Sequence, residues 1–394
     1  MDSAKNLYSA GAFIQAGIDA AFARRLGAVS DVEVNFVPAQ PHQAENVEQT
    51  EQPEQEDRPV LDQRATVRFT TTNGTYDCEG LRLATMKDGQ FHWATELAEH
   101  SDIPEFRGPQ PDTALLRGLA RRLVGDRPVV RVPQAAGESL VAVDFVELAP
   151  NPTAVILAGL ERSGEIEGGV DERIATAELA SYMNVPSNNP DALAQFEGSR
   201  IVALPHPSGQ PFLTAQDILA DAHYLAAEHN FFLDGRFPNL HADLDPETSK
   251  TVVTTAYGSL TVPAHLIATL DESAGTFTWA WADKLASTPS AQTVSNVRRF
   301  AYDQAIPELV RARVPIAHAR KARLPQLAMP ILGLWTLLPV RLPDGRHGLA
   351  LSDAPAFRLP APTPAAIDAT VRIPVPQGVD EQRARAAYRR QRGV

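Results

Sequence analysis

The sequence has one cysteine, Cys78, among 394 residues. A single cysteine excludes an internal disulfide framework and any zinc site built from several cysteines. The strand-like sequence around Cys78 predicts a half-buried structural thiol. Long apolar runs are also missing. The longest candidate, LAMPILGLWTLLPV, contains two prolines and is shorter than the ~20 residues of a membrane-spanning helix.

Positive charge is scarce as well, and the net charge is −12. This balance argues against general affinity for nucleic acids and for anionic membrane surfaces. The opening segment, MDSAKNLYSAGAFIQAGIDAAFARRLG, lacks the basic start and the unbroken apolar stretch of a secretory signal peptide. We therefore expect a cytoplasmic protein that associates with neither membranes nor nucleic acids in general.

Familiar catalytic motifs are absent from the sequence. It contains no Gly-x-Ser-x-Gly elbow, no phosphate-binding glycine-rich loop, no His-Glu-x-x-His and no dinucleotide-binding fingerprint. We predict no cofactor and no metal. The balance favours a protein that is not an enzyme and leaves an enzyme open as the alternative.

An internal repeat is the strongest pattern that is present. The segments NGTYDCEGLRLATMKDGQFHWATE and YGSLTVPAHLIATLDESAGTFTWAWAD match in order, and the motif Gly-Val-Asp-Glu follows both, at 169–172 and 378–381. Several blocks in the same order indicate a tandem duplication. We place the first repeat at residues 1–186 and the second at residues 187–394.

Each repeat has the same predicted order of elements. An amphipathic helix comes first, with Thr214 as the predicted N-cap in the second repeat. Alternating strands, an arginine-containing helix (TALLRGLARRLVG or TVSNVRRFAYDQAI), a hairpin and a short helix follow. This order predicts an α+β fold of two similar tandem modules, each an antiparallel sheet with flanking helices.

One segment interrupts the first repeat. PAQPHQAENVEQTEQPEQEDRP has no apolar periodicity and is rich in Glu, Gln and Pro. Such a composition cannot bury a core, so we predict a disordered acidic insertion over residues 38–60.

Two tryptophans stand two positions apart in GTFTWAWADK. Residues two apart share a face of a strand, so Phe277, Trp279 and Trp281 are predicted to point the same way, most simply into a core. In the first repeat the position of Trp281 is taken by Thr95. A position that accepts both residues predicts partial exposure for Trp281 and full burial for Trp279.

The TWAWAD strand, the preceding SLTVPAHLIATLD and the following arginine-containing helix carry a resemblance. Over residues 214–345 the sequence resembles an uncharacterised bacterial family of unknown function marked by a Thr-Trp-x-Trp-Ala-Asn strand. Asp283 departs from that motif, which has Asn there. The resemblance implies a domain and implies no activity.

Charged residues form three further patterns. Asp217, Asp221 and Glu228 lie on one face of a predicted helix, where they would bind a divalent cation or, more simply, face solvent. The segment HADLD sets His241, Asp243 and Asp245 at alternate positions, as metal ligands or as turn and cap residues. The C-terminal segment DEQRARAAYRRQRGV predicts a basic helix that would dock an acidic partner or RNA, or lie in solvent.

Two functions follow from these patterns. The first is an interaction or regulatory protein that contacts a protein partner through the basic C-terminal helix or the acidic insertion. The alternative is an enzyme or ligand-binding protein with a site in the cleft between the two repeats. The candidate ligand-binding residues of that alternative are Trp281, Asp283, His265 and His241.

Overall fold

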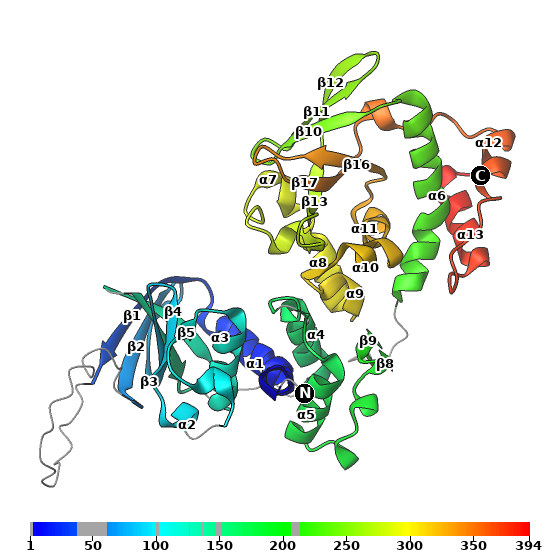
Figure 1. Cartoon of the computed structure of the whole chain (residues 1–394). Coiled ribbons are helices and arrows are strands. Elements are labelled where there is room, and N and C mark those ends of the chain that lie inside the picture. The colour runs from blue at the N-terminus through cyan, green and yellow to red at the C-terminus, as the bar shows by residue number, and fades with distance from the viewer. Residues whose placement is uncertain are drawn as a thin grey trace, which may run out of the picture. The chain divides into compact units, whose positions relative to one another are not determined.

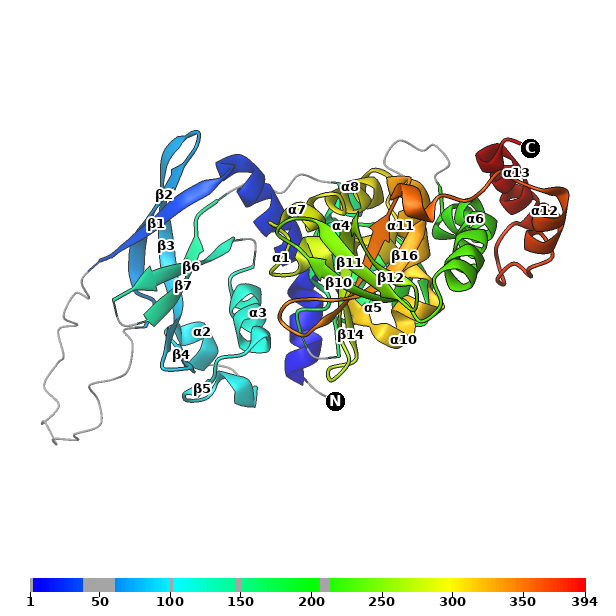
Figure 2. The same ribbon diagram turned by 90° about the horizontal axis from the view of Figure 1, so that it is seen from above.

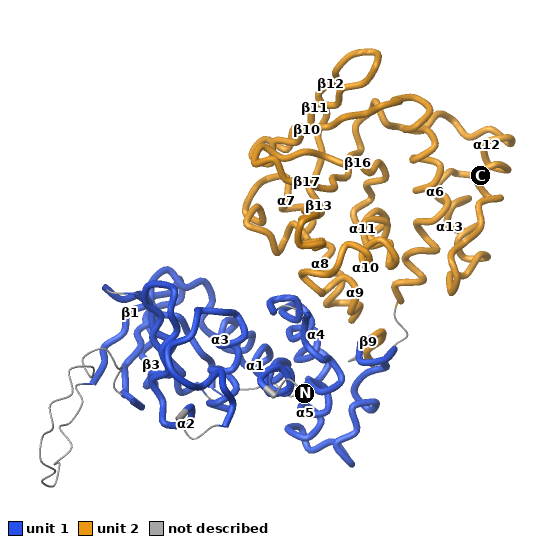
Figure 3. The backbone as a smooth tube through the Cα atoms, viewed as in Figure 1, with its two compact units in different colours: residues 1–201 blue, residues 202–394 orange. Residues whose placement is uncertain are grey.

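The computed structural model describes residues 3–37, 61–99, 102–125, 127–135, 137–145, 151–166, 168–205 and 213–394. The predicted insertion at residues 38–60 lies outside these ranges. The chain divides into two compact units, residues 1–201 and residues 202–394 (Figure 3). Both units combine helices with antiparallel sheet, so the predicted α+β class is confirmed. The repeat boundary at residue 186 stays a prediction about the sequence.

Unit 1 begins with a long helix, continues through a sheet and ends with helices (Figure 1). Its helices are α1 (Ser3–Leu26), α2 (Glu96–Glu99), η1 (Pro104–Phe106), α3 (Ala114–Leu123), α4 (Pro152–Arg162), α5 (Glu172–Tyr182), η2 (Pro186–Asn188) and η3 (Pro190–Ala192). Its strands are β1 (Val29–Phe36), β2 (Arg64–Thr71), β3 (Gly74–Lys87), β4 (Gln90–Trp93), β5 (Gln110–Pro111), β6 (Val129–Gln134) and β7 (Gly137–Val143). A separate ribbon of β8 (Gln195–Glu197) and β9 (Arg200–Ala203) follows, and β9 contains the boundary between the units.

Unit 2 has the same order of a long helix, a sheet and final helices. Its helices are α6 (Ala215–Arg236), η4 (Ala280–Ala282), α7 (Pro289–Gln292), α8 (Ser295–Asp303), α9 (Pro307–Val310), α10 (Ile316–Lys321), α11 (Leu324–Leu332), η5 (Pro355–Phe357), α12 (Pro364–Thr370) and α13 (Glu381–Arg392). Its strands are β10 (His241–Asp245), β11 (Lys250–Thr255), β12 (Gly258–Pro263), β13 (His265–Asp271), β14 (Thr276–Trp279), β15 (Arg313–Pro315), β16 (Thr336–Arg341) and β17 (His347–Ser352).

Some strand pairings of the two sheets are alike, although the first sheet has seven strands and the second has eight. In unit 1 the order is β1-β2-β3-β4-β5, and β7 pairs with both β3 and β6; in unit 2 it is β12-β11-β10-β16-β17-β13-β14-β15. The β3–β7 pairing has a bulge between Arg82 and Ala84, and the β13–β17 pairing has one between Leu266 and Ala268. Ala84 pairs with Trp93 as Ala268 pairs with Trp279.

The order of elements corrects one equivalence expected from the sequence. The arginine-containing helices α3 and α8 were matched, but α8 comes before the edge strand β15, whereas α3 comes after the edge strand β5. The helix directly before the β16–β17 hairpin is α11, so α11 stands where α3 stands before the β6–β7 hairpin.

A long helix lies at the centre of each unit (Figures 1 and 2). Helix α1 has α3 and the sheet on one side and α4 and α5 on the other, and it packs against all three of these helices. Helix α6 packs against α11 and β16 on one side and against α13 on the other. The final helices therefore cover the face of the central helix that the sheet leaves open.

Local sequence signals account for several helix ends. Thr214 caps α6 as predicted, because its hydroxyl accepts from the Asp217 backbone N–H while the Asp217 carboxylate accepts from the Thr214 N–H, a reciprocal capping box. Asp171 and Asp380, in the two Gly-Val-Asp-Glu motifs, cap α5 and α13 in the same way as each other. Among the described helices, none combines the length and apolar character needed to cross a bilayer.

The tryptophan strand is shorter than its alternating pattern predicts. β14 ends at Trp279, which is fully buried with its ring edge-on to Phe277. Trp281 lies in the 3₁₀ turn η4 and is half-buried, with the guanidinium carbon of Arg298 5.4 Å from its ring centre. The predicted exposures of the two tryptophans are confirmed. The prediction that both lie on one strand face is wrong, because the chain turns before Trp281.

Candidate functional site

The four residues that the sequence predicts as a ligand site each interact with different partners. Asp283 accepts hydrogen bonds from Thr269 Oγ1 at 2.9 Å, from Leu285 N at 3.0 Å and from Arg346 Nη1 at 2.8 Å. Burial by itself would raise the pKa of Asp283, but the hydrogen bond from Arg346 and the others lower it. Its side chain is only 9% exposed, so it joins η4 to the β16–β17 turn instead of facing a ligand.

The other three predicted residues have separate surroundings. His265 Nδ1 lies 2.9 Å from Thr293 Oγ1, and burial lowers the pKa of His265. His241 is exposed at the start of β10, opposite Thr254. Within the described ranges, no hydrogen bond, ion pair or ring contact joins any two of Trp281, Asp283, His265 and His241.

The acidic stripe of α6 and the basic C-terminal helix turn out to be partners of each other. Arg383 of α13 bridges Asp217 and Asp221. Tyr388 donates to Glu228 Oε2 at 2.9 Å, and Arg392 Nε lies 3.0 Å from the same oxygen. The acidic stripe of α6 was predicted to bind a divalent cation or to face solvent, and neither prediction describes its pairing with α13. In the described part of the chain, no group of three or more His, Cys, Asp or Glu could hold a metal ion.

A pocket lies beside this helix pair in unit 2. Its empty volume is about 810 Å³, a figure that includes open solvent at the mouth. It is formed by α6, the start of β16, the segment after β17 and the end of α13 (Figure 1). Its lining residues are Leu225, His229, Trp335, Thr336, Ser352, Asp353, Ala354, Phe357, Arg358, Leu359, Gln391 and Arg392.

The apolar wall of this pocket continues into a core. Trp335 and Leu359 pack against a buried cluster that includes Leu225, Tyr224 of α6 and Tyr388 of α13. Trp335 itself is half-buried, so part of its ring faces the opening. Because packing already holds the Trp335 ring in place, its side chain would lose little conformational entropy when an apolar ligand binds against it.

A neutral imidazole lies in the pocket. Burial, and to a smaller degree the charge of Arg392, lower the pKa of His229 to about 4. Its Nδ1 lies 3.3 Å from Thr336 Oγ1. At neutral pH His229 therefore presents an uncharged ring that can donate or accept a hydrogen bond.

The charges around the pocket divide into a paired and an unpaired set. Arg392 forms an ion pair with Glu228, and its Nη2 also donates a hydrogen bond to the Pro360 carbonyl at 2.8 Å. Asp353 and Arg358 are both exposed at the pocket, and neither has an ion-pair partner among the described residues. The free charges at the mouth are thus one negative and one positive.

Sequence reasoning missed this pocket because its residues come from four separated segments. The only local signal is Trp335, the one tryptophan outside the two matched repeat segments, in the apolar run LAMPILGLWTLLPV. Among the four predicted residues, the pKa of His265 responds to a pocket residue, because the charge of Asp353 raises it against the larger lowering effect of burial.

The comparisons with known proteins identify part of the chain. Residues 216–355, which include α6 and the strands β10–β17, match a family model described as "Family of unknown function (DUF6882)". No curated protein and no solved structure matches the chain. The matched range contains the first half of the pocket's lining, from Leu225 to Ala354, and stops before Phe357.

Proposed function

We propose that this chain is a regulatory protein, not an enzyme, and that unit 2 binds a small zwitterionic molecule with an apolar body, such as a free amino acid. The observation that carries this proposal is the pair of unpaired opposite charges, Asp353 and Arg358, beside the apolar wall of Trp335. In this arrangement Arg358 binds the carboxylate, Asp353 binds the ammonium group and Trp335 contacts the apolar side chain.

The side chains that could act as nucleophiles are already engaged. Ser352 is 1% exposed, donates to the Pro263 carbonyl and accepts from Ala354 N. Thr336 is 2% exposed beside the neutral His229. Burial, with the charges of Asp77 and Asp144, raises the pKa of Cys78, which keeps this thiol protonated. These contacts favour binding over catalysis.

Further parts of the proposal concern origin, location and partners. The matching β3–β7 and β13–β17 pairings and their bulges support a tandem duplication. A bacterial source and a cytoplasmic location stay parts of the proposal. Arg389 and Arg390 are exposed on α13, so they are the residues proposed to contact an acidic protein partner. The alternative of an enzyme or ligand site between the two repeats stays a prediction.

Ligand titration of the full chain tests the zwitterion proposal. Leucine should produce a saturable change in tryptophan fluorescence and a matching calorimetric signal. N-acetyl-leucine, which lacks the cation, and leucine methyl ester, which lacks the anion, should each bind at least about tenfold more weakly, because each leaves one charged residue unmatched. Equal binding of leucine and either derivative contradicts the proposal.

Three variants assign the site. Arg358→Ala and Asp353→Asn should each weaken leucine binding about tenfold or more. Trp335→Phe should remove most of the fluorescence change while calorimetry still detects binding. The matched control is Arg320→Ala, an exposed arginine of α10 that does not line the pocket. Loss of binding in Arg320→Ala equal to that in Arg358→Ala would point to general charge effects.

A further inference from the structure

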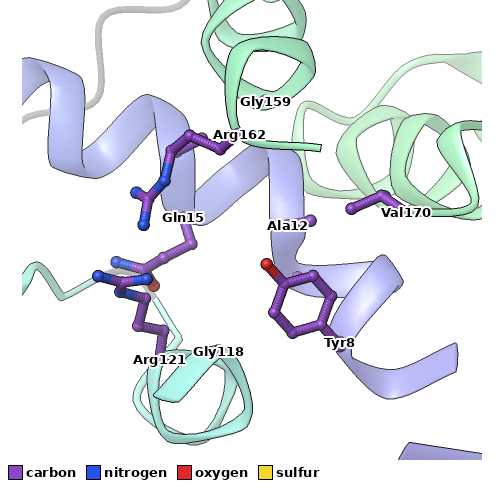
Figure 4. A pocket seen from close by; sticks show the side chains of 10 residues that line it. Tyr8, Ala12, Gln15, Gly118, Arg121, Gly159, Arg162 and Val170 are labelled. Carbon is purple, nitrogen blue, oxygen red and sulfur yellow. The ribbon is translucent and has the colours of Figure 1, made fainter. Parts of the chain in front are cut away.

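A second pocket lies inside unit 1, where α1, α3 and α4 meet (Figure 4). Its empty volume is about 350 Å³ counting the mouth. Its lining residues are Tyr8, Gly11, Ala12, Gln15, Ala16, Gly118, Arg121, Gly159, Arg162 and Val170. It belongs to a different unit from the pocket described above and shares none of its residues.

Glycines allow the three helices to approach closely enough to form this pocket. A Cβ at Gly118 would lie 1.8 Å from the ring of Tyr8, and a Cβ at Gly159 would lie 2.1 Å from the ring of Phe13. One edge of the Tyr8 ring therefore lies against Gly118 of α3, and its hydroxyl is directed toward the pocket (Figure 4). Burial raises the pKa of Tyr8, and the charge of Glu165 raises it further, so the hydroxyl keeps its proton.

The charges beside the pocket balance one another. Arg162 pairs with Asp19 at 2.5 Å and with Glu165 at 3.0 Å. Arg121 has a longer ion pair, 3.7 Å from its Nε to Asp19 Oδ2. Two guanidinium groups thus face two carboxylates. An incoming group with a full negative charge would meet no excess of positive charge here.

Among the described residues that line this pocket, one buried acceptor and one buried donor have no hydrogen-bond partner. Gln15 is only 5% exposed; its Nε2 donates to Asp19 Oδ1 at 2.9 Å and to the Arg127 carbonyl at 3.0 Å, which leaves its Oε1 unbonded. Arg121 Nε is also buried without a hydrogen-bond partner. Figure 4 shows that Gln15 of α1 and Arg121 of α3 line the same pocket as Tyr8, whose hydroxyl points into it. Unmet buried polar groups of this kind cost about 1–3 kcal/mol each.

We propose that this pocket binds the primary carboxamide group of a small neutral molecule. A carboxamide carries an acceptor and a donor on neighbouring atoms. Its carbonyl oxygen accepts from Arg121 Nε, its N–H donates to Gln15 Oε1, and the Tyr8 hydroxyl lies beside them. A carboxylate meets only half of this requirement, because it has no hydrogen to donate to Gln15 Oε1.

Nuclear magnetic resonance on the full chain tests the proposal with acetamide as the probe. Acetamide should cause saturable shifts of the Gln15 side-chain amide and of the Arg121 Nε–H signals. Acetate, its charged counterpart of nearly the same size, should cause no saturable shift at the same concentrations. A linear, non-saturating response to acetamide, as expected for a pocket that holds only water, overturns the proposal, and so does an equal response to acetate.

Two variants and one control complete the test. Arg121→Lys moves the donor and should weaken acetamide binding at least about tenfold while Gln15 keeps its hydrogen bonds. Gln15→Leu should abolish binding, although it also removes the two hydrogen bonds that Nε2 makes within unit 1. The control Gln90→Leu changes an exposed glutamine of β4 and should leave binding unaltered. Unchanged acetamide affinity in Arg121→Lys contradicts the assignment.

Discussion

Arg383 binds Asp221 through two parallel hydrogen bonds, from Nε to Oδ1 at 3.0 Å and from Nη2 to Oδ2 at 2.7 Å, although the two residues are 162 positions apart. The remaining nitrogen, Nη1, reaches Asp217 at 3.1 Å. One arginine of the last helix therefore joins two acidic residues of the first helix of unit 2. The same helix pair forms a wall of the proposed ligand pocket through Arg392, so its stability bears on the pocket.

We expect Arg383→Ala to lower the free energy of unfolding by about 1 kcal/mol. The two parallel hydrogen bonds between Arg383 and Asp221 make this pair stronger than a typical surface ion pair. The side chains of Arg383, Asp217 and Asp221 are partly exposed, which limits how much they stabilise the fold. Urea denaturation measures the change. The matched control is Arg389→Ala, an exposed arginine on the same helix, which should stay within about 0.5 kcal/mol of the native chain. Equal losses would mean that α13 is not held by Arg383.

Asp283 is expected to be a structural residue. Asp283→Ala should cost about 3 kcal/mol, because it leaves Arg346 Nη1, the Thr269 hydroxyl and the Leu285 N–H without the carboxylate that accepts from them. Asp283→Asn keeps an acceptor but loses its charge, so about 1 kcal/mol is expected. Chemical denaturation of both variants decides the matter, with the exposed Glu272→Gln as the control. A stable Asp283→Ala variant would return this residue to the candidate ligand-binding set.

Trp279 and Trp281 should differ in their contribution to stability. Trp279→Ala removes a fully buried ring from the sheet core and should cost about 4 kcal/mol. Trp281→Ala removes a half-buried ring that has Arg298 beside it, so about half of that loss is expected. Denaturation curves of the two variants provide the comparison. Equal losses would place both rings in the core.

Because His229 is neutral in the folded chain, we expect the free energy of unfolding to fall as the pH is lowered. Because its folded pKa of about 4 lies below the unfolded value of about 6.5, the unfolded chain takes up a proton first as the pH falls. This single group should remove about 2 kcal/mol between pH 7 and pH 5. The contribution of His229 to the free energy of unfolding is fully present at pH values above the unfolded pKa. It is lost progressively as the pH falls from there to the folded pKa.

The difference between the native chain and His229→Gln isolates this group from the carboxylates. The variant should lose less stability than the native chain between pH 7 and pH 5, as measured by urea denaturation at each pH. His241→Gln, which changes an exposed histidine, should follow the native chain. Parallel curves for the native chain and His229→Gln would show that His229 titrates normally in the fold.

Local features of the fold could be predicted from the sequence because their causes lie within a few residues. The Thr214 capping box joins residues three apart. The burial of Trp279 follows from strand alternation and its counterpart Trp93. The end of β14 could not be predicted in this way. The alternation continues to Trp281, but the chain turns there and Asp283 is tied to Arg346, 63 residues later.

The sequence by itself determined the α+β class, the caps of several helices and the burial of Trp279, since composition, periodicity and caps act along the chain. Only the tertiary structure decided which charged side chains remain free. The acidic stripe of α6 and the basic α13 each suggested an outside partner, and folding brings them together. Among the groups that stay unmatched in the described residues are instead Asp353 and Arg358 at one pocket and Gln15 Oε1 and Arg121 Nε at the other. Hydrogen bonds and ion pairs act over a few ångströms in space, and separation along the sequence does not set that distance.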